Sequence, residues 1–176
     1  MKNNFIKKLF VVFTFFVQWI VLPSYDTKDE YTIKALFVYN FTKYIEWNEQ
    51  SLPQQFRIGV YGESEISEKL SQIVKGKKLY NRTIELKALK TIDDAAGYQI
   101  VYIVKDQGTA LQILLDKYSG TEMLLITEEK NMGIKGAGIN IIEKDQRMKF
   151  ELNESAIKKS GLKVSSQLYD LAIVIK

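Results

Sequence analysis

The sequence predicts a single three-layer α/β domain, in which a largely parallel, twisted sheet is followed by a C-terminal β-hairpin and two C-terminal helices. Apolar runs of strand length alternate with amphipathic stretches of helix length as far as Thr127, which is typical of a parallel sheet covered on both faces. The pattern changes at Gly138–Asn153, where two short strand-like runs flank a polar turn and predict a hairpin. Only one of the two prolines, Pro53, lies inside this region, and no linker divides it.

The first predicted helix, Lys28–Asn48, has a polar residue in the middle of its apolar stripe. At about 100° per residue, Asn40 lies at the centre of this stripe, whereas Lys34 lies on the opposite, solvated face. The stripe consists of Ile33, Leu36, Phe37, Tyr44 and Trp47. A buried amide must be hydrogen-bonded, so we expect Asn40 to tie the helix to the sheet while Tyr39 and Lys43 face outward. The alternative is that this aromatic side lines a pocket or a partner groove.

Helix-capping residues, glycines and changes in the spacing of apolar residues mark where each of the following elements begins and ends. The predicted strands are Gln54–Gly62, Arg82–Leu89, Tyr98–Val104 and Glu122–Thr127. The predicted helices are Ser64–Gly76, a short turn at Thr91–Gly97, Gly108–Gly120, Asn153–Gly161, and a last helix from Ser165 or Ser166 to the C-terminal residue. We expect Asn153 to cap the helix that it begins.

Two motifs resemble catalytic features, and simpler structures explain both. The "GIKGAG" stretch, Gly133–Gly138, does not have the spacing of a dinucleotide loop, and a strand follows it instead of a helix. It therefore predicts a turn. The carboxylate pairs Asp93–Asp94 and Glu128–Glu129 are expected in solvated turns, because neighbours in sequence point in different directions and no second acidic cluster accompanies them.

The residue inventory excludes several classes of enzyme. The chain has neither cysteine nor histidine, which excludes disulfide bonds, the usual zinc sites, and Ser-His-Asp or Cys-His nucleophilic systems. The apolar fraction of 46% indicates a globular core. Residues 1–24 carry three lysines and no acid, so most of the net charge of +4 lies there and nothing favours nucleic acid as a partner. We expect no catalytic residue, metal or cofactor, and not an enzyme.

The first 24 residues have the layout of a secretory signal peptide. Lysines precede the apolar run Leu9–Leu22, whose 14 residues are too few to span a membrane comfortably. Cleavage after Ser24 would leave residues 25–176 as one exported domain. An uncleaved anchor is the alternative, because Leu22 is larger than the usual small residue near a cleavage site.

Four segments, in this order along the chain, resemble those of a known family. They are "YTIKALFVYNFTKYIEW", "FRIGVYGES", "GKKLYNRTIELKAL" and "GINIIEKDQRMKFELNESAIKKSGLKVSSQLYDLAIVI". Over residues 29–176 the chain resembles the YfiR-like family of small exported bacterial proteins. The resemblance implies a periplasmic regulator that binds and inhibits the periplasmic sensor domain of an inner-membrane signalling enzyme, typically a diguanylate cyclase. Such inhibition keeps cyclic-di-GMP low and restrains biofilm formation. Because the chain lacks cysteine, it cannot use the disulfide-based sensing of the best-known members.

The resemblance also implies a second function, a periplasmic module that binds a small ligand. Nucleotides or tryptophan are associated with some members of the family, and some members form homodimers. The usual ligand crevice of a parallel sheet lies at the carboxyl ends of the strands, here near Gly62, Lys105–Gly108 and Thr127. The target of such a module is either a membrane histidine kinase or the same cyclase, if ligand binding changes its affinity for that receptor.

The first helix and the C-terminal segment hold the candidate residues for binding a partner or ligand. Those of the helix are Lys34, Tyr39, Asn40 and Lys43. Those of the C-terminal segment are Glu151, Asn153, Lys163, Ser165 and Ser166. Each has a structural alternative: the asparagine and serines are good helix caps, and the lysines are ordinary solvated charges.

Overall fold

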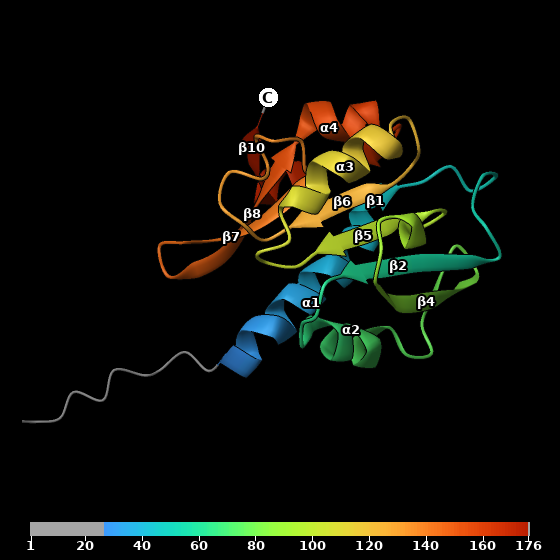
Figure 1. The fold of residues 1–176 in the computed structure, drawn as a ribbon, viewed down its shortest axis with the longest axis horizontal. Coiled ribbons are helices and arrows are strands. Elements are labelled where there is room, and N and C mark those ends of the chain that lie inside the picture. Colours follow the sequence, from blue (N-terminus) through green and yellow to red (C-terminus); the bar gives the residue numbers. More distant parts are fainter. Residues whose placement is uncertain (1–26, 176) are drawn as a thin grey trace, which may run out of the picture.

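The computed structural model describes residues 27–175, so the predicted signal peptide lies outside the described residues. These residues form one α/β domain (Figure 1). The strands are β1 (Ile45–Glu46), β2 (Gln55–Tyr61), β3 (Lys78–Leu79), β4 (Arg82–Leu89), β5 (Ile100–Ile103), β6 (Leu124–Thr127), β7 (Ile139–Lys144), β8 (Arg147–Asn153), β9 (Lys163–Val164) and β10 (Ile173–Ile175). The helices are α1 (Thr27–Tyr44), α2 (Ile66–Val74), the 3-10 turn η1 (Asp93–Ala95), α3 (Thr109–Lys117), α4 (Glu154–Lys159) and α5 (Ser166–Leu171). Within this part of the chain, no helix has both the length and the apolar composition that a membrane crossing requires.

The main sheet has eight strands in the order β10-β8-β7-β6-β5-β2-β4-β3. The five strands from β7 to β4 run parallel, β7 and β8 form an antiparallel hairpin, and β3 is antiparallel to β4. These findings confirm the predicted largely parallel sheet with a C-terminal hairpin. Since β2 lies between β4 and β5, the strand order reverses there, and this topological switch point is the usual ligand crevice of such sheets.

Alternate residues of the central strands point into two separate apolar layers. On β5, Ile100 and Tyr102 face the layer that includes α1 and α2, whereas Val101 and Ile103 face the layer that includes α3. All four side chains are at most 1% exposed. The prediction of three layers is thereby confirmed, and α1 and α3 lie on opposite faces of one sheet.

Helix α1 buries a different stripe from the predicted one. Ala35, Val38 and Phe41 are at most 1% exposed, whereas Leu36, a member of the predicted stripe, is 43% exposed. Within this stripe, Phe41 packs against the sheet, and the centroid of its ring lies 5.0 Å from that of Phe150 on β8.

Asn40 does not tie α1 to the sheet, so that prediction is wrong. Its side chain is half-buried, and its Oδ1 accepts a 3.0 Å hydrogen bond from Lys43 Nζ at the surface. Lys34, expected on the solvated face, is buried instead. The physical reason is that a carboxylate on the sheet pairs with Lys34, which makes burial of this cation tolerable.

The C-terminal segment confirms two helices and adds an unpredicted strand. Asn153 caps α4, because its Oδ1 accepts from the Ala156 N–H at 2.8 Å. The prediction that the last helix runs to the C-terminal residue is wrong: α5 ends at Leu171, and Ile173–Ile175 forms β10, parallel to β8. Three consecutive β-branched residues favour a strand, and the free edge of β8 supplies the pairing partner.

Candidate functional site

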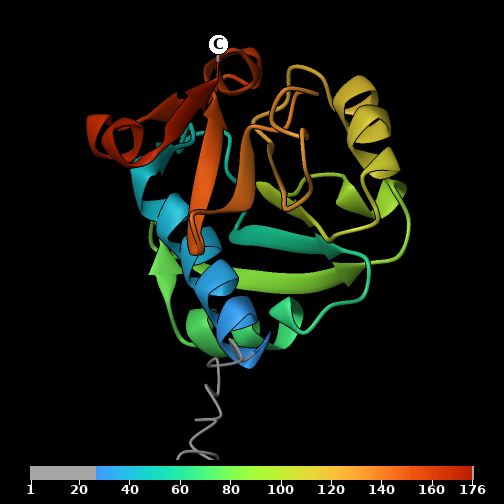
Figure 2. The ribbon, with the colours of Figure 1, turned by 90° about the vertical axis from the view of Figure 1, so that its left-hand side faces the viewer.

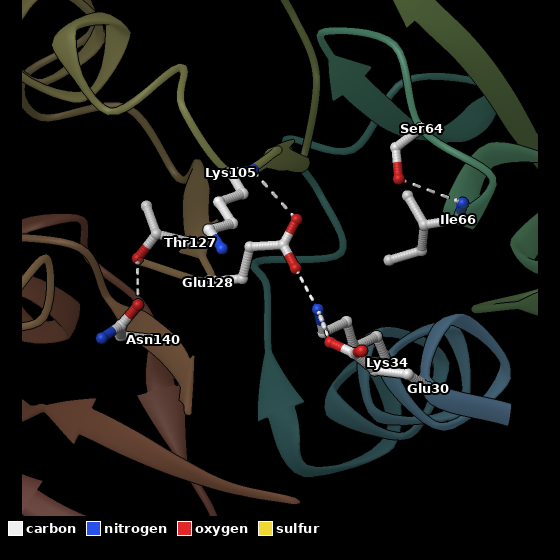
Figure 3. A network of polar contacts seen from close by, with 8 residues as sticks. All are labelled: Glu30, Lys34, Ser64, Ile66, Lys105, Thr127, Glu128 and Asn140. Atoms are coloured by element: carbon white, nitrogen blue, oxygen red, sulfur yellow. Dashed lines mark hydrogen bonds and ion pairs between the residues drawn. The ribbon is translucent and has the colours of Figure 1, made fainter. Parts of the chain in front are cut away.

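A buried cluster of charges lies where α1 crosses the carboxyl edge of the sheet (Figure 3). The ammonium group of Lys34 contacts the carboxylates of Glu30, one turn earlier on α1, and Glu128, directly after β6. The side chains of Lys34 and Glu128 are only 10% and 4% exposed. The second carboxylate oxygen of Glu128 accepts a 3.0 Å hydrogen bond from the backbone N–H of Lys105, directly after Val104. The cluster therefore joins α1 to two loops of the carboxyl edge.

The charge states in this cluster follow from the balance between burial and pairing. Burial by itself would lower the pKa of Lys34, but the hydrogen bonds and charges of Glu128 and Glu30 outweigh it, so the pKa lies above its ordinary value. Tyr102, on β5 beneath the cluster, is fully buried. Burial, together with the nearby charge of Glu128, raises the pKa of its phenol well above the ordinary value. The cluster thus holds a protonated lysine and a neutral phenol.

This cluster occupies the edge where the sequence predicts a ligand crevice. The loops after β2, β5 and β6 do come together there, as expected for parallel strands. Gly62, directly after β2, lies very close to Val104, directly after β5. A Cβ atom at Gly62 would lie 2.3 Å from a methyl group of Val104, and the φ angle of +101° also favours glycine there. From α1, the ammonium group of Lys34 reaches the same edge and contacts Glu128 there (Figure 3). The cluster therefore fastens α1 to the edge at the predicted ligand position.

The prediction that Glu128 lies in a solvated acidic turn is wrong, because its side chain is buried. Glu129, its neighbour, is half-buried and lines a separate cavity of about 330 Å³ beside the start of α3. A signal for Glu128 was present, since it directly follows a fully apolar strand at the carboxyl edge of the sheet. What the sequence did not reveal is the lysine opposite, because Lys34 is 94 residues away.

Two of the predicted residues of the C-terminal segment are held by bonds within the fold. Glu151 on β8 accepts a 2.8 Å hydrogen bond from Asn140 Nδ2, and Asn140 Oδ1 accepts one of 2.8 Å from Thr127. Asn153 caps α4 and also donates to the carbonyl of Gly133 at 2.8 Å. These contacts support the structural alternative for both residues.

The remaining residues of the C-terminal segment lie near the end of α1. Lys163 on β9 pairs in register with Glu46 on β1, and the Ser165 N–H donates to the Tyr44 carbonyl at 2.9 Å. Ser165 caps α5 through its Oγ, while Lys163 and Ser166 are exposed. The structure thus brings the end of the first helix and the C-terminal segment side by side, as a shared surface requires.

The outer face of α1 carries the other predicted residues. We define this outer face as Leu36, Tyr39, Asn40 and Lys43. Figure 2 shows α1 running along one side of the molecule beside the β7–β8 hairpin. The Nζ atoms of Lys43 and Lys77 lie 4.6 and 4.3 Å from the centroid of the Tyr39 ring, so two cations share one aromatic side chain. Three of the four candidate residues of this helix, Tyr39, Asn40 and Lys43, thus share its outer side, whereas Lys34 is buried.

A cavity of about 320 Å³ lies between α3 and α4, on the other side of the sheet. Its floor is apolar and includes Leu114 and Leu125, and its rim carries Lys135 and Lys159. Asn153 also lines it. Its volume is near the lower limit of the range that small-molecule sites span.

One solved structure with a similar fold supports the architecture. A conserved domain protein from Vibrio cholerae superposes with a TM-score of 0.51 and 9% identity, covering 83% of this chain and 60% of that one. The ABC domain in complex with L-Trp from Streptococcus pneumoniae matches with a TM-score of 0.47 and 10% identity, covering 68% of this chain and 55% of that one. This chain thus spans less than two thirds of the length of either structure.

Comparison with protein families identifies the chain more closely. No curated protein sequence matches it. A family model described as DUF4154, YfiR/HmsC-like, matches residues 31–173, which is most of the chain and nearly all of the described domain. The match includes α1, the carboxyl edge and the hairpin. The chain therefore belongs to the YfiR/HmsC-like family, whose members are periplasmic regulators of diguanylate cyclases and not enzymes.

Proposed function

We propose that this protein binds the periplasmic sensor domain of an inner-membrane diguanylate cyclase and holds the enzyme inactive by direct contact. Family membership supports the class of receptor. The observation that carries the proposal is the outer face of α1, where an apolar side chain, Leu36, lies beside polar and charged ones in a single accessible stripe. Protein interfaces combine such apolar, aromatic and polar groups.

The C-terminal segment supports the same surface. The hydrogen bond between Ser165 and Tyr44 and the pairing of β1 with β9 hold Lys163 and Ser166 beside the end of α1. Leu171 on α5 is 68% exposed and adds an apolar side chain to this region of the C-terminal segment. A receptor domain that covers α1 and extends past its C-terminal end would contact both segments that the sequence predicts.

Two variants with matched exposure test the proposal. Production of the wild-type protein in its native host should lower cyclic-di-GMP and biofilm formation, and deletion of its gene should raise both. Leu36→Arg on the outer face of α1 should abolish repression, whereas Ile113→Arg on α3, where the isoleucine is 52% exposed, should not. Thermal melts must show both variants folded. Equal repression by the two variants would contradict the role of α1, and no response to the wild-type protein would contradict the function.

A second function is supported by the cavity between α3 and α4. Its apolar floor and the ammonium groups of Lys135 and Lys159 suit a small molecule with an apolar body and an anionic group, such as a nucleotide or an aromatic amino acid. A module of this kind would act through a cyclase or a membrane histidine kinase. Thermal-shift measurements with nucleotides and amino acids separate the functions, because a pure contact inhibitor should show no shift.

A further inference from the structure

The lysines beside Tyr39 are cations that the fold does not neutralise. Lys43 at the end of α1 and Lys77 after α2 both contact the Tyr39 ring, and Lys75 and Lys78 flank Lys77 in sequence. All four lysines are exposed. Among the side chains of residues 30–175, none of these four ammonium groups forms an ion pair with a carboxylate. We call Lys43, Lys75, Lys77 and Lys78 the lysine cluster.

Local structure explains only part of the lysine cluster. The helix dipole favours a cation at the C-terminal end of a helix, which accounts for Lys43 in the last turn of α1 and Lys75 at the C-cap of α2. It does not account for Lys77 and Lys78. The Tyr39 ring attracts a nearby cation by about 0.5–1 kcal/mol at an exposed site, but it carries no net charge and neutralises neither lysine. An anion placed against Lys43 and Lys77 would supply the counter-charge that both lack.

We propose that the lysine cluster binds an acidic segment of the receptor's periplasmic domain, with carboxylates pairing with Lys43 and Lys77 beside the Tyr39 ring. This inference rests on the proposed function and names the chemistry of the contact. Carboxylates accept charge-assisted hydrogen bonds from ammonium groups, and complementary charges steer two proteins into the correct orientation. The exposed apolar side chain of Leu36 lies on the same side of α1, two turns before Lys43.

Two observations favour an acidic protein segment over an anionic membrane surface. The chain after residue 24 carries 22 basic and 21 acidic residues, so the positive charge is local and the domain as a whole is not cationic. Lys43 also donates to Asn40, and the exposed Leu36 lies on the same outer face of α1, a mixture of amide and apolar groups typical of protein interfaces.

The test uses poly-L-glutamate as a probe for acidic segments, with the purified exported protein at low salt. The variant Lys43→Glu/Lys77→Glu reverses the two charges at the ring, and Lys130→Glu/Lys144→Glu reverses two exposed lysines elsewhere. We expect the wild type and the second variant to bind with similar Kd values, and the first variant to bind about tenfold more weakly or not at all. Added salt should weaken wild-type binding.

Three results would overturn the inference. They are no binding of the probe by the wild type, an equal loss in both variants, and cluster-dependent binding to phosphatidylglycerol vesicles that exceeds binding to poly-L-glutamate. The variant Lys43→Gln/Lys77→Gln, which removes the charges without reversing them, replaces the first variant if melting curves show that the latter is unfolded.

Measurement in cells separates this inference from the proposed function. The inference and the proposed function are both supported if the wild type and Lys130→Glu/Lys144→Glu lower cyclic-di-GMP and Lys43→Glu/Lys77→Glu does not. If all three repress equally, the lysine cluster does not contact the receptor, although the proposed function stands. If the wild type fails to repress, the proposed function fails, and the probe then reports only that the cluster binds acidic chains.

Discussion

Replacing Lys34 with methionine will leave the carboxylate of Glu128 buried without its cation. Methionine keeps an unbranched apolar chain of similar length, so the loss of packing is small. Removing one partner of a buried ion pair costs about 3–5 kcal/mol. Glu128 is only 4% exposed and retains one hydrogen bond, from the Lys105 N–H at 3.0 Å. We therefore expect the free energy of unfolding to fall by about 3 kcal/mol, the lower end of that range.

Urea denaturation followed by circular dichroism at neutral pH measures this loss. The double variant Lys34→Met/Glu128→Gln removes both charges and should recover much of the stability, because no unpaired charge stays buried. Lys117→Met is the control, since Lys117 contacts Asp93 in an ion pair whose side chains are 43% and 80% exposed. Its free energy of unfolding should change by less than about 1 kcal/mol.

The pH dependence of the same variants checks the electrostatic origin of the effect. The pKa of Lys34 is raised in the folded protein. The ion pair therefore stabilises the folded state fully at pH values below the ordinary lysine pKa of about 10.4. As the pH rises through the folded pKa, this contribution is lost, and the difference between wild type and Lys34→Met should shrink. A loss below about 1 kcal/mol at neutral pH, or a double variant no more stable than Lys34→Met, would refute the reasoning.

Three further substitutions or titrations follow from the hydrogen bonds and burial. Asn40→Ala should change the free energy of unfolding by less than about 0.5 kcal/mol in urea denaturation, because its amide is at the surface; a loss above about 1 kcal/mol would restore the predicted core role. Asn153→Ala removes the cap of α4 and the bond to the Gly133 carbonyl and should cost about 1–3 kcal/mol in the same assay, whereas no loss would contradict both bonds. Because burial raises the pKa of Tyr102, the unfolded chain loses this proton near pH 10 while the folded protein keeps it, so stability should fall as the pH rises above about 10. In a spectrophotometric titration, Tyr102→Phe should remove one late-titrating phenol, and an unchanged curve would contradict this assignment.

The order of the elements could be predicted because each carries its own local signal. Arg82–Leu89 has the same bounds in the prediction and in the structure, and Asn153 caps α4 as its residue type predicts. The short pairings could not be predicted. β1 and β9 have two residues each, and β10 has three. Such segments have no period of their own and become strands only because the fold brings them to a partner.

The errors in predicting which side chains of α1 are buried have a related cause. Helical periodicity shows which residues share a face, but it does not show which face meets the sheet when aromatic residues occupy more than one side. Lys34 illustrates the limit: a lone lysine predicts solvent, and only Glu128, 94 residues away, makes its burial favourable. Among the candidate residues of α1, Tyr39 and Lys43 lie at the surface as predicted.

The buried cluster and the outer face of α1 are coupled through the rigidity of the helix. Lys34 fastens one half of α1 to the carboxyl edge, and the β1–β9 pairing fastens the other end. Tyr39 and Lys43 lie between these two attachments, so their positions are set before any partner arrives, which lowers the ordering cost of binding. Lys34→Met should therefore raise the hydrogen exchange of amides in α1 more than in β2 or β5. If exchange in α1 is unchanged, the cluster does not position the outer face of this helix, whatever its effect on global stability.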